Sequence, residues 1–181
     1  MEDLTGKNID RYEITGLIAS GGMAYVYRAC DPHLNRVVAI KLVRAESFTP
    51  DELPTLLERF KNEAKIIANL SHPNIVKVFD YGEYEGVPYL VMELVEGKTL
   101  RSLLTKPIDY SDAAELLIPL ADALSYMHEN GLLHRDIKPS NIIISVTPYV
   151  QPYVWISLLN LINDCPQKFL NVHLIFPTFR F

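Results

Sequence analysis

Short runs of apolar and β-branched residues dominate the first half of the chain. Residues 11–18, 24–30 and 37–43 are three such runs, separated by small or polar turn residues. This pattern is typical of consecutive antiparallel strands. Two further runs, 75–82 and 88–94, flank a short polar connection. The sequence therefore predicts five antiparallel strands in its first half.

The period changes to that of a helix between the third and fourth predicted strands. Apolar side chains recur every three or four positions over residues 53–70, and Thr49 and Glu52 form a helix-start signal just before them. Pro54 is expected to delay the regular helix by a turn. One helix is therefore predicted to accompany the five strands.

A second, longer helical pattern covers residues 111–131. Ser111 is its predicted N-cap and Gly131 its predicted stop, and Pro119 is expected to kink it. A short helix is also expected after Thr99. The predicted fold class is α+β, with a strand-rich first part and a helical second part.

Charge limits the kinds of ligand. The 17 Lys and Arg against 22 Asp and Glu give a formal net charge of −5, which lacks the basic surplus expected of a nucleic-acid binder. A phosphorylated ligand would therefore need a local cationic site. The two cysteines, Cys30 and Cys165, show no metal or disulfide spacing, which favours a reducing, cytoplasmic compartment.

The composition changes near Ser145. Residues 145–181 contain only Asp164, Lys168 and Arg180 as charged residues. The uncharged stretch 139–163 is interrupted by prolines, and its densely apolar part is too short to cross a bilayer. We therefore expect no membrane span, and we interpret residues 145–181 as a divergent apolar tail.

Gly21 and Gly22 lie between the first two predicted strands. Without a Cβ, their backbone amides can approach an anionic ligand closely, although a plain hairpin turn would have the same sequence. A Rossmann site would need a helix after the glycines, and a Walker A loop would need Gly-Lys-Ser/Thr. Neither pattern is present.

Lys41 and Glu63 are charged residues at positions that suit burial. Lys41 lies in a strand that is otherwise apolar, and Glu63 falls inside the apolar stripe of the predicted helix. A buried carboxylate needs a cation, so we predict that the two form an ion pair. The alternative is that both side chains reach separately to solvent.

The stretch "HRDIKPSN" carries the densest chemistry in the chain. From one loop, Asp136, Lys138 and Asn141 offer a proton acceptor, a phosphate clamp and a metal ligand. Each of them alone could be an ordinary surface residue. Together they favour phosphoryl transfer.

The order of these motifs resembles the protein kinase family, specifically the bacterial-type serine/threonine kinases. "SGGMAYVY", "VAIK", Glu63 in "RFKNEA", "HPNIV", "LVMELVEGKTL" and "HRDIKPSN" match that family across residues 11–144. The resemblance implies a protein-kinase-like fold. Residues 1–95 would form the small lobe and hinge, 96–144 the start of the large lobe, and 145–181 the divergent tail.

The resemblance also implies ATP as cofactor. Gly21 and Gly22 would cover its phosphates, and Lys41, held by Glu63, would contact the α- and β-phosphates. The other positions that match nucleotide-binding residues of the family are Leu17, Val26, Ala39, Met92, Glu93 and Val95.

Three residues of the loop match the family's catalytic positions. Asp136 would accept the hydroxyl proton of a Ser or Thr on a protein substrate, Lys138 would steady the transferring phosphoryl group, and Asn141 would bind Mg²⁺. The implied activity is transfer of the ATP γ-phosphoryl group to protein hydroxyls.

The chain departs from the family in three ways. Ala19 and Ala24 replace two loop glycines, and the sequence contains neither Asp-Phe-Gly nor Ala-Pro-Glu. Asp164 is the sole acid after Asp136. One hypothesis is therefore a kinase domain truncated before its metal site, and the other is a catalytically inactive, pseudokinase-like module that binds nucleotide or a partner. An uncovered apolar face on residues 111–131 would favour self-association, a partner or cover by the tail.

Overall fold

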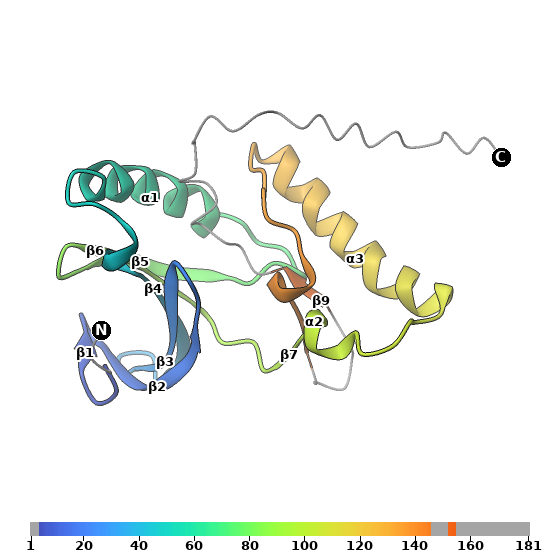
Figure 1. Cartoon of the computed structure of the whole chain (residues 1–181), viewed down its shortest axis with the longest axis horizontal. Helices are drawn as coiled ribbons and strands as arrows, with labels where there is room; N and C mark the ends of the chain where they lie inside the picture. Colours follow the sequence, from blue (N-terminus) through green and yellow to red (C-terminus); the bar gives the residue numbers. More distant parts are fainter. Residues whose placement is uncertain (1–3, 146–151, 155–181) are drawn as a thin grey trace.

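The structure is a computed structural model that describes residues 4–145 and, for the backbone, residues 152–154. The predictions made for Asp164 and for most of the divergent tail fall outside the described residues. Two regions are recognisable in Figure 1. A sheet region comprises residues 8–93, and a helical region comprises residues 97–145 with 152–154.

A six-stranded antiparallel sheet forms the sheet region, in the order β1-β2-β3-β4-β6-β5. All five predicted strands are present in this sheet. The one strand of this sheet that the sequence did not predict is the two-residue β1. The strand predicted over 75–82 starts later, at Val78, and Ile75 and Val76 are buried in the segment before it. The strands are β1 (Asn8–Ile9), β2 (Tyr12–Ser20), β3 (Ala24–Asp31), β4 (Arg36–Val43), β5 (Val78–Tyr84) and β6 (Val87–Glu93).

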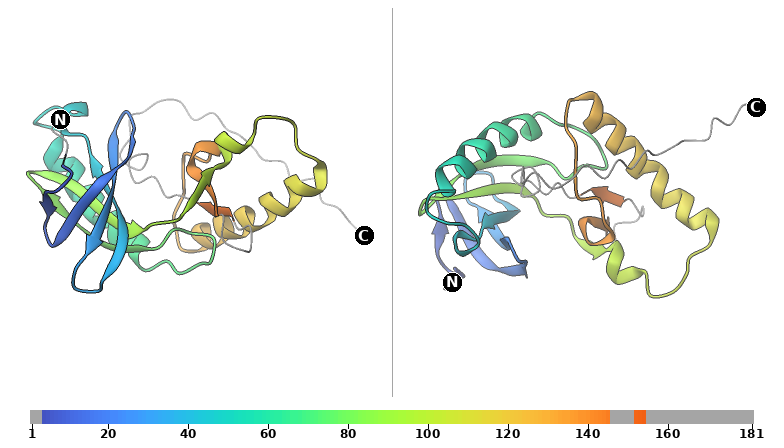
Figure 2. Two further views of the ribbon diagram at one scale, coloured as in Figure 1. Left: turned by 90° about the horizontal axis from the view of Figure 1, so that it is seen from below. Right: turned by 45° about the horizontal axis from the view of Figure 1, so that its top comes forward.

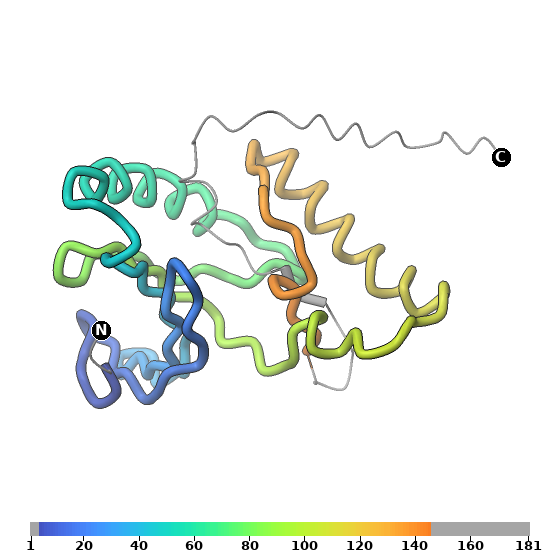
Figure 3. Tube along the Cα trace, in the orientation of Figure 1, coloured from blue at the N-terminus to red at the C-terminus, as the bar shows by residue number. Residues whose placement is uncertain are grey.

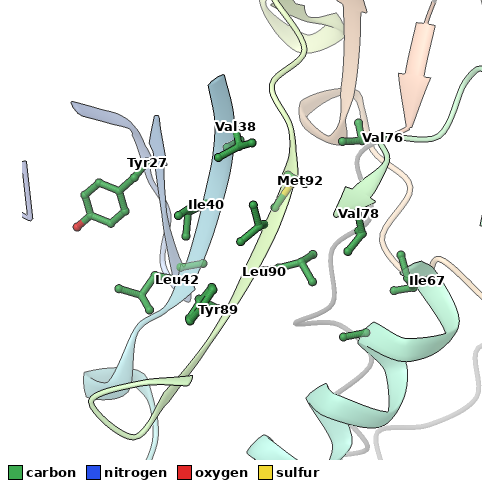
Figure 4. Packing of buried hydrophobic residues seen from close by; sticks show 14 of the residues in the cluster. Tyr27, Val38, Ile40, Leu42, Ile67, Val76, Val78, Tyr89, Leu90 and Met92 are labelled. Atoms are coloured by element: carbon green, nitrogen blue, oxygen red, sulfur yellow. The ribbon is translucent and has the colours of Figure 1, made fainter. Parts of the chain in front are cut away.

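Helix α1 (Leu53–Ala68) packs on this sheet against β5 and β6. It starts where the sequence signal indicates, since the Glu52 carboxylate accepts hydrogen bonds from the backbone N–H and the hydroxyl of Thr49, at 2.7 and 2.9 Å. Pro54 lies in the first turn of α1, where its missing N–H costs nothing, so the predicted delay of the helix by a turn is wrong. Figure 4 shows Ile67 of α1 facing Val78 of β5. The buried residues of the helix are Leu56, Phe60, Ala64 and Ile67.

The helical region begins with a small antiparallel sheet in the order β7-β8-β9. Gly97 is required at its start, because a Cβ there would overlap the carbonyl oxygen of Ile144 on the neighbouring strand. The elements are η1 (Ala45–Ser47), which precedes α1, and then β7 (Gly97–Thr99), α2 (Leu100–Leu103), α3 (Tyr110–Glu129), η2 (Pro139–Asn141), β8 (Ile142–Ser145) and β9 (Pro152–Val154).

Helix α3 differs from its prediction at the start. Its N-cap is Asp109 instead of Ser111, and the helix continues on both sides of Pro119. Gly131 follows the helix with φ of +75°, the left-handed conformation typical of a glycine after a C-cap. Leu120, Ala123 and Met127 are buried, whereas the side chains of Leu117 and Ile118 are exposed.

The segment after α1 is tied to α3. His72 Nε2 lies 3.1 Å from Asp122 Oδ2, and its Nδ1 accepts a hydrogen bond from the Asn74 N–H at 3.2 Å. The Tyr126 hydroxyl accepts a hydrogen bond from the Ser71 N–H at 3.3 Å. These contacts join the sheet and helical regions. Residues 94–96 also connect the two regions along the chain, as the trace in Figure 3 shows.

Most of the buried core lies in the sheet region, where the strands contribute most of its residues and α1 packs against β5 and β6. The two views of Figure 2 show α3 standing away from the six-stranded sheet, with the small sheet between them. Within residues 4–145 and 152–154, no helix combines the length and apolar character that a membrane crossing requires.

Candidate functional site

A cavity of about 600 Å³ opens between the two regions. The loop between β2 and β3 covers one side, the end of the segment after β6 forms the back, and the loop around η2 forms the floor. Its lining residues are Ile18, Ala19, Ser20, Gly21, Gly22, Met23, Ala24, Val26, Lys41, Leu94, Val95, Gly97, Thr99, Asp136, Lys138, Ser140, Asn141 and Ile143.

The backbone at the floor is held in a tight turn. Arg135 has φ of +59°, a left-handed conformation that costs a non-glycine residue about 1 kcal/mol or more. This turn brings the Asp136 N–H to the His134 carbonyl oxygen at 2.8 Å. His134 is buried beneath the loop, so its side chain supports the turn and does not face the cavity. The strained backbone thus fixes the position of Asp136.

The Asp136 carboxylate is the centre of the polar group on the floor. Its Oδ2 lies 2.8 Å from Lys138 Nζ and accepts a hydrogen bond from Asn141 Nδ2 at 2.8 Å. The same Asn141 amide donates to the Asp136 carbonyl oxygen at 2.9 Å. Because the Asn141 N–H groups are used in this way, its Oδ1 remains as an acceptor on a residue that lines the cavity.

Lys41 reaches the cavity from β4 and is buried, with 8 % of its surface exposed. Burial lowers the pKa of Lys41 to about 8, and Lys138 acts in the same direction while Asp136 opposes it. The charges of Asp136 and Lys138 on the floor therefore act on Lys41 across the cavity. The lysine is poised to bind an anion, since a counter-charge would favour its protonated form.

Glu63 lies on α1 with its Oε2 buried, which agrees with its predicted place in the apolar stripe. Its position matches the expectation that a carboxylate would face inward from this helix. Pairing of Glu63 with Lys41 stays a prediction. The carboxylate whose charge raises the pKa of Lys41 is Asp136.

The glycine-containing loop is tied to the segment 44–47 behind it. Arg44 Nη2 donates to Ser20 Oγ at 2.9 Å, and the Arg44 guanidinium stacks over the Tyr25 ring at 4.2 Å from its centroid. Ser47 Oγ donates to the Gly22 carbonyl oxygen at 3.0 Å. These contacts hold the loop that covers the cavity.

Neither alanine substitution in this loop is strained. Ala19 pairs with Val26 in the β2–β3 ladder, and Ala24 begins β3. Neither has a positive φ. A Cβ at Gly21 would approach the Ala24 carbonyl oxygen to 3.4 Å, and one at Gly22 would meet nothing within 4 Å. The loop thus forms without the two glycines that the family pattern has at 19 and 24.

Eight of the predicted site residues come together around the cavity, from β3, β4, the glycine loop, the segment after β6 and the floor: Gly21, Gly22, Val26, Lys41, Val95, Asp136, Lys138 and Asn141. The remaining ones lie beside it. Ala39 and Met92 face each other in the β4–β6 register and are buried. Leu17 precedes the lining residue Ile18 on β2 and is half exposed, and the Glu93 N–H donates to the Lys77 carbonyl oxygen at 2.8 Å.

Sequence reasoning missed several lining residues. Ser20 and Met23 are neighbours of the predicted glycines, and Ser140 lies between Lys138 and Asn141. Their proximity in sequence was the available signal. Gly97 and Thr99 enter the cavity only because β7 pairs with β8, a contact that no local pattern shows.

Comparison with protein-family models matches the description "Protein kinase domain" over residues 12–152. The serine/threonine-protein kinase PrkC of Bacillus subtilis is 42% identical over 144 residues, which are 78% of this chain and 22% of that protein. The serine/threonine-protein kinase PknB of Mycobacterium tuberculosis is 42% identical over 148 residues, or 78% of this chain and 23% of that protein. The chain therefore spans about a fifth of the length of these curated relatives.

Solved structures agree with the sequence comparison. The structure titled "PpkA-294 apo form" superposes with a TM-score of 0.75 at 30% identity, covering 87% of this chain and 61% of that one. The crystal structure of the Mycobacterium tuberculosis PknI kinase domain gives a TM-score of 0.72 at 24% identity, covering 84% and 63%, and supports the fold. The α+β, kinase-like fold class is confirmed. The chain belongs to the protein kinase domain family, and its sequence is of the bacterial serine/threonine kinase type.

Proposed function

We propose that this chain is the ATP-binding part of a serine/threonine protein kinase domain, together with the loop that receives the protein substrate. The observation that carries the proposal is the convergence of Lys41 from β4 with Asp136, Lys138 and Asn141 on one cavity beneath the glycine loop. On this proposal residues 1–95 form the nucleotide-binding lobe and hinge, and residues 96–144 the start of the substrate-binding lobe. Residues 145–181 form a divergent tail.

Each cavity residue has a role that its contacts support. The buried Lys41, which lines the same cavity as Gly21 and Gly22, would bind phosphate oxygens through its ammonium group. Asp136 would accept the proton of a Ser or Thr hydroxyl, because its carboxylate is held on the floor by two hydrogen-bond donors. Lys138, which is half exposed, would follow the transferring group.

The nucleotide would be oriented by the remaining predicted residues. Val26 and Val95 line the cavity and would contact the adenine, with Leu17, Ala39 and Met92 behind them. The Glu93 carbonyl and the Val95 N–H would hold the adenine edge, since the Glu93 N–H is already taken by Lys77. ATP would supply the phosphoryl group, and in this family a divalent metal supplies positive charge for its transfer.

The described residues fit ATP better than they fit Mg²⁺. Asn141 Oδ1 is a metal ligand of the type expected, but Mg²⁺ in nucleotide sites is usually held by one or two carboxylates. The one carboxylate among the described lining residues, Asp136, is bonded to Lys138 and Asn141. We therefore assign no catalytic step to a metal in these residues.

A second function is favoured by this incomplete metal site. In it, the chain binds nucleotide or a partner protein without turnover, as a pseudokinase-like module. The sequence without Asp-Phe-Gly supports this alternative. When the inactive module binds nucleotide, the two functions share the nucleotide cavity and differ in whether the phosphoryl group is transferred.

The test measures binding and transfer on the same preparation. ATP binding to the 181-residue chain is measured by calorimetry, and transfer of radiolabel from ATP to a generic basic protein is measured beside a Lys41→Ala variant. We expect ATP binding that weakens by about tenfold or more in the variant, because the lysine charge is lost in a site of low dielectric.

The transfer assay then separates the two functions. Label that disappears in Lys41→Ala supports the kinase. Binding without label supports the inactive module as a nucleotide binder, and the absence of ATP binding overturns both the kinase and the nucleotide-binding form of the inactive module. Circular dichroism of the variant excludes unfolding as the cause of a lost signal.

A further inference from the structure

The described lining of the cavity carries more positive than negative charge. Lys41 and Lys138 contribute two ammonium groups, and Asp136 is the single acid among these lining residues. The remaining lining residues are apolar, small or neutral. Although the chain as a whole has a net charge of −5, the cavity is therefore a local cationic site.

The Asp136 carboxylate is already engaged. Its Oδ2 is shared by the Lys138 ammonium and the Asn141 amide, each at 2.8 Å. Even after the Lys138 ammonium has moved away, a metal ion that used this oxygen would have to displace the Asn141 amide, which also donates to the Asp136 carbonyl oxygen at 2.9 Å. Among residues 4–145 and 152–154, no cluster of three or more His, Cys, Asp or Glu side chains could hold a metal ion.

The backbone register gives independent support. β9 pairs with β8 so that Val154 lies opposite Ile142, the residue that follows Asn141. β9 is thus the strand that lies next to the residue following the floor loop. Its sequence is Pro-Tyr-Val. The described part of this strand brings no carboxylate to the floor.

We propose that this cavity binds the nucleotide as a metal-free polyphosphate anion, with Lys41 and Lys138 supplying the positive charge that Mg²⁺ usually supplies. The proposal rests on the proposed function, since it concerns the same cavity and the same ligand. Chelation by Mg²⁺ lowers the negative charge of ATP, so it weakens the attraction to the two ammonium groups. Mg²⁺ is then neutral or unfavourable for binding.

When the nucleotide binds, the Lys138 ammonium group would break its ion pair with Asp136 and form one with the phosphates. Its side chain is half exposed and its ion pair with Asp136 spans only one intervening residue, so the pair is partly solvated and weakly held. A polyphosphate carries several negative charges against the one on Asp136. Transfer of the ammonium group to the ligand is therefore inexpensive.

The experiment is calorimetric titration of ATP into the 181-residue chain at matched ionic strength, once in excess EDTA and once in excess MgCl₂. We expect Kd values that differ by less than about threefold, or a tighter Kd in EDTA. Tightening by Mg²⁺ of about tenfold or more would overturn the proposal. In that case, loss of the tightening in Asp164→Asn would identify the metal ligand.

Two lysine variants test the source of the charge in EDTA. Lys138→Met should weaken ATP binding by about tenfold, whereas Lys106→Met, an exposed lysine outside the cavity lining, should leave Kd unchanged. Equal Kd values for wild type and Lys138→Met would also overturn the proposal.

The outcomes distinguish this inference from the proposed function. Binding of ATP that requires Mg²⁺ contradicts the metal-free mode and leaves nucleotide binding intact. Failure to bind ATP in either buffer contradicts nucleotide binding itself, and the inference falls with it.

Discussion

Helices α1 and α3 both carry an apolar face, but α3 leaves more of its large apolar side chains exposed than α1 does. Phe60 on α1 is 2 % exposed, because β5 and β6 lie directly beneath it. Ile118 on α3 is 69 % exposed, and among the described strands β9 is the one that makes the main contact with that helix. The same kind of amphipathic sequence thus gives a packed helix in one region and a largely uncovered one in the other.

This difference shows what an amphipathic stripe does and does not specify. The stripe sets which face of a helix will be buried, but burial requires a partner surface of matching size. For α1 the partner is the sheet formed by neighbouring strands. For α3 the described residues cover Leu120, Ala123 and Met127 and leave Leu117 on the surface.

The largest expected effect comes from truncating one apolar side chain in each helix. Phe60→Ala should destabilise the chain by about 3–5 kcal/mol, because it removes a buried ring and leaves a cavity. Ile118→Ala should change the free energy of unfolding by less than about 0.5 kcal/mol. Urea denaturation followed by circular dichroism measures both values.

A milder substitution keeps this test valid if Phe60→Ala does not fold. Phe60→Leu retains most of the apolar volume and should cost about 1–2 kcal/mol. A large loss for Ile118→Ala would contradict the comparison, since it would mean that the outer face of α3 is buried in solution.

A hydrogen-bonded tyrosine of the sheet region can be compared with an exposed tyrosine of α3. The Tyr12 hydroxyl donates to Asp80 Oδ2 at 2.8 Å, inside the sheet region, while Tyr110 at the start of α3 is 91 % exposed. Burial, with the neighbouring Asp80, raises the pKa of Tyr12. Tyr12→Phe should destabilise the chain by about 1–2 kcal/mol, because it removes a buried hydrogen bond to a charged group.

Tyr110→Phe is the matched control and should leave stability unchanged within about 0.5 kcal/mol. Thermal unfolding of both variants under identical conditions gives the difference. Equal melting temperatures for the two variants would argue that the Tyr12 hydroxyl is hydrated in solution.

The two regions also differ in how far the sequence predicted them. In the sheet region, the apolar and β-branched runs of β2 to β4 and the apolar stripe of α1 are local signals, because each one lies within a single continuous segment of the sequence. The floor loop was predictable too, because Asp136, Lys138 and Asn141 are near neighbours in the chain and one turn brings them together.

Long-range pairing of very short segments could not be predicted. β7 pairs with β8 through Lys98 and Ile144, which are far apart in sequence, and three-residue strands are too short to show a period. The contacts of Arg44 and Ser47 with the glycine loop were missed for a similar reason. Polar residues in a connecting segment carry no periodic signal, so only the fold reveals which ones meet.

The pH dependence of stability and of ATP affinity should report on Lys41, the buried lysine of the sheet region. The folded-state pKa of Lys41, lowered to about 8 by burial, lies below the ordinary value of an unfolded lysine. The folded chain therefore holds fewer protons than the unfolded chain above about pH 8, and stability rises as pH increases through this range. ATP affinity should change in the opposite direction, because deprotonation removes the charge that binds phosphate.

Measurement of stability and ATP affinity on either side of this pKa checks both signs. In Lys41→Met the rise in stability and the fall in affinity around pH 8 should both disappear. An affinity that still falls in the variant would assign the titration to another group. A stability that is flat in the wild type would show that Lys41 is solvated in the free chain.

The smallest expected effect concerns the contact between Ser47 and the glycine loop that covers the cavity. Ser47→Ala removes the hydrogen bond to the Gly22 carbonyl oxygen, at 3.0 Å on an exposed segment. We expect ATP to dissociate about twofold to fivefold faster, since an exposed neutral hydrogen bond contributes about 0.5–1 kcal/mol. Stopped-flow displacement of a fluorescent ATP analogue measures this rate.

Ser125→Ala, which removes an exposed hydroxyl on α3 far along the chain from the loop, is the matched control. If the segment 44–47 positions the glycine loop, only Ser47→Ala changes the dissociation rate, and the melting temperature of both variants stays at the wild-type value. An unchanged rate in Ser47→Ala would mean that Arg44, through Ser20 and Tyr25, holds the loop without Ser47. Because a loosened cover should affect escape of the ligand more than its entry, an altered association rate alone would also contradict this role.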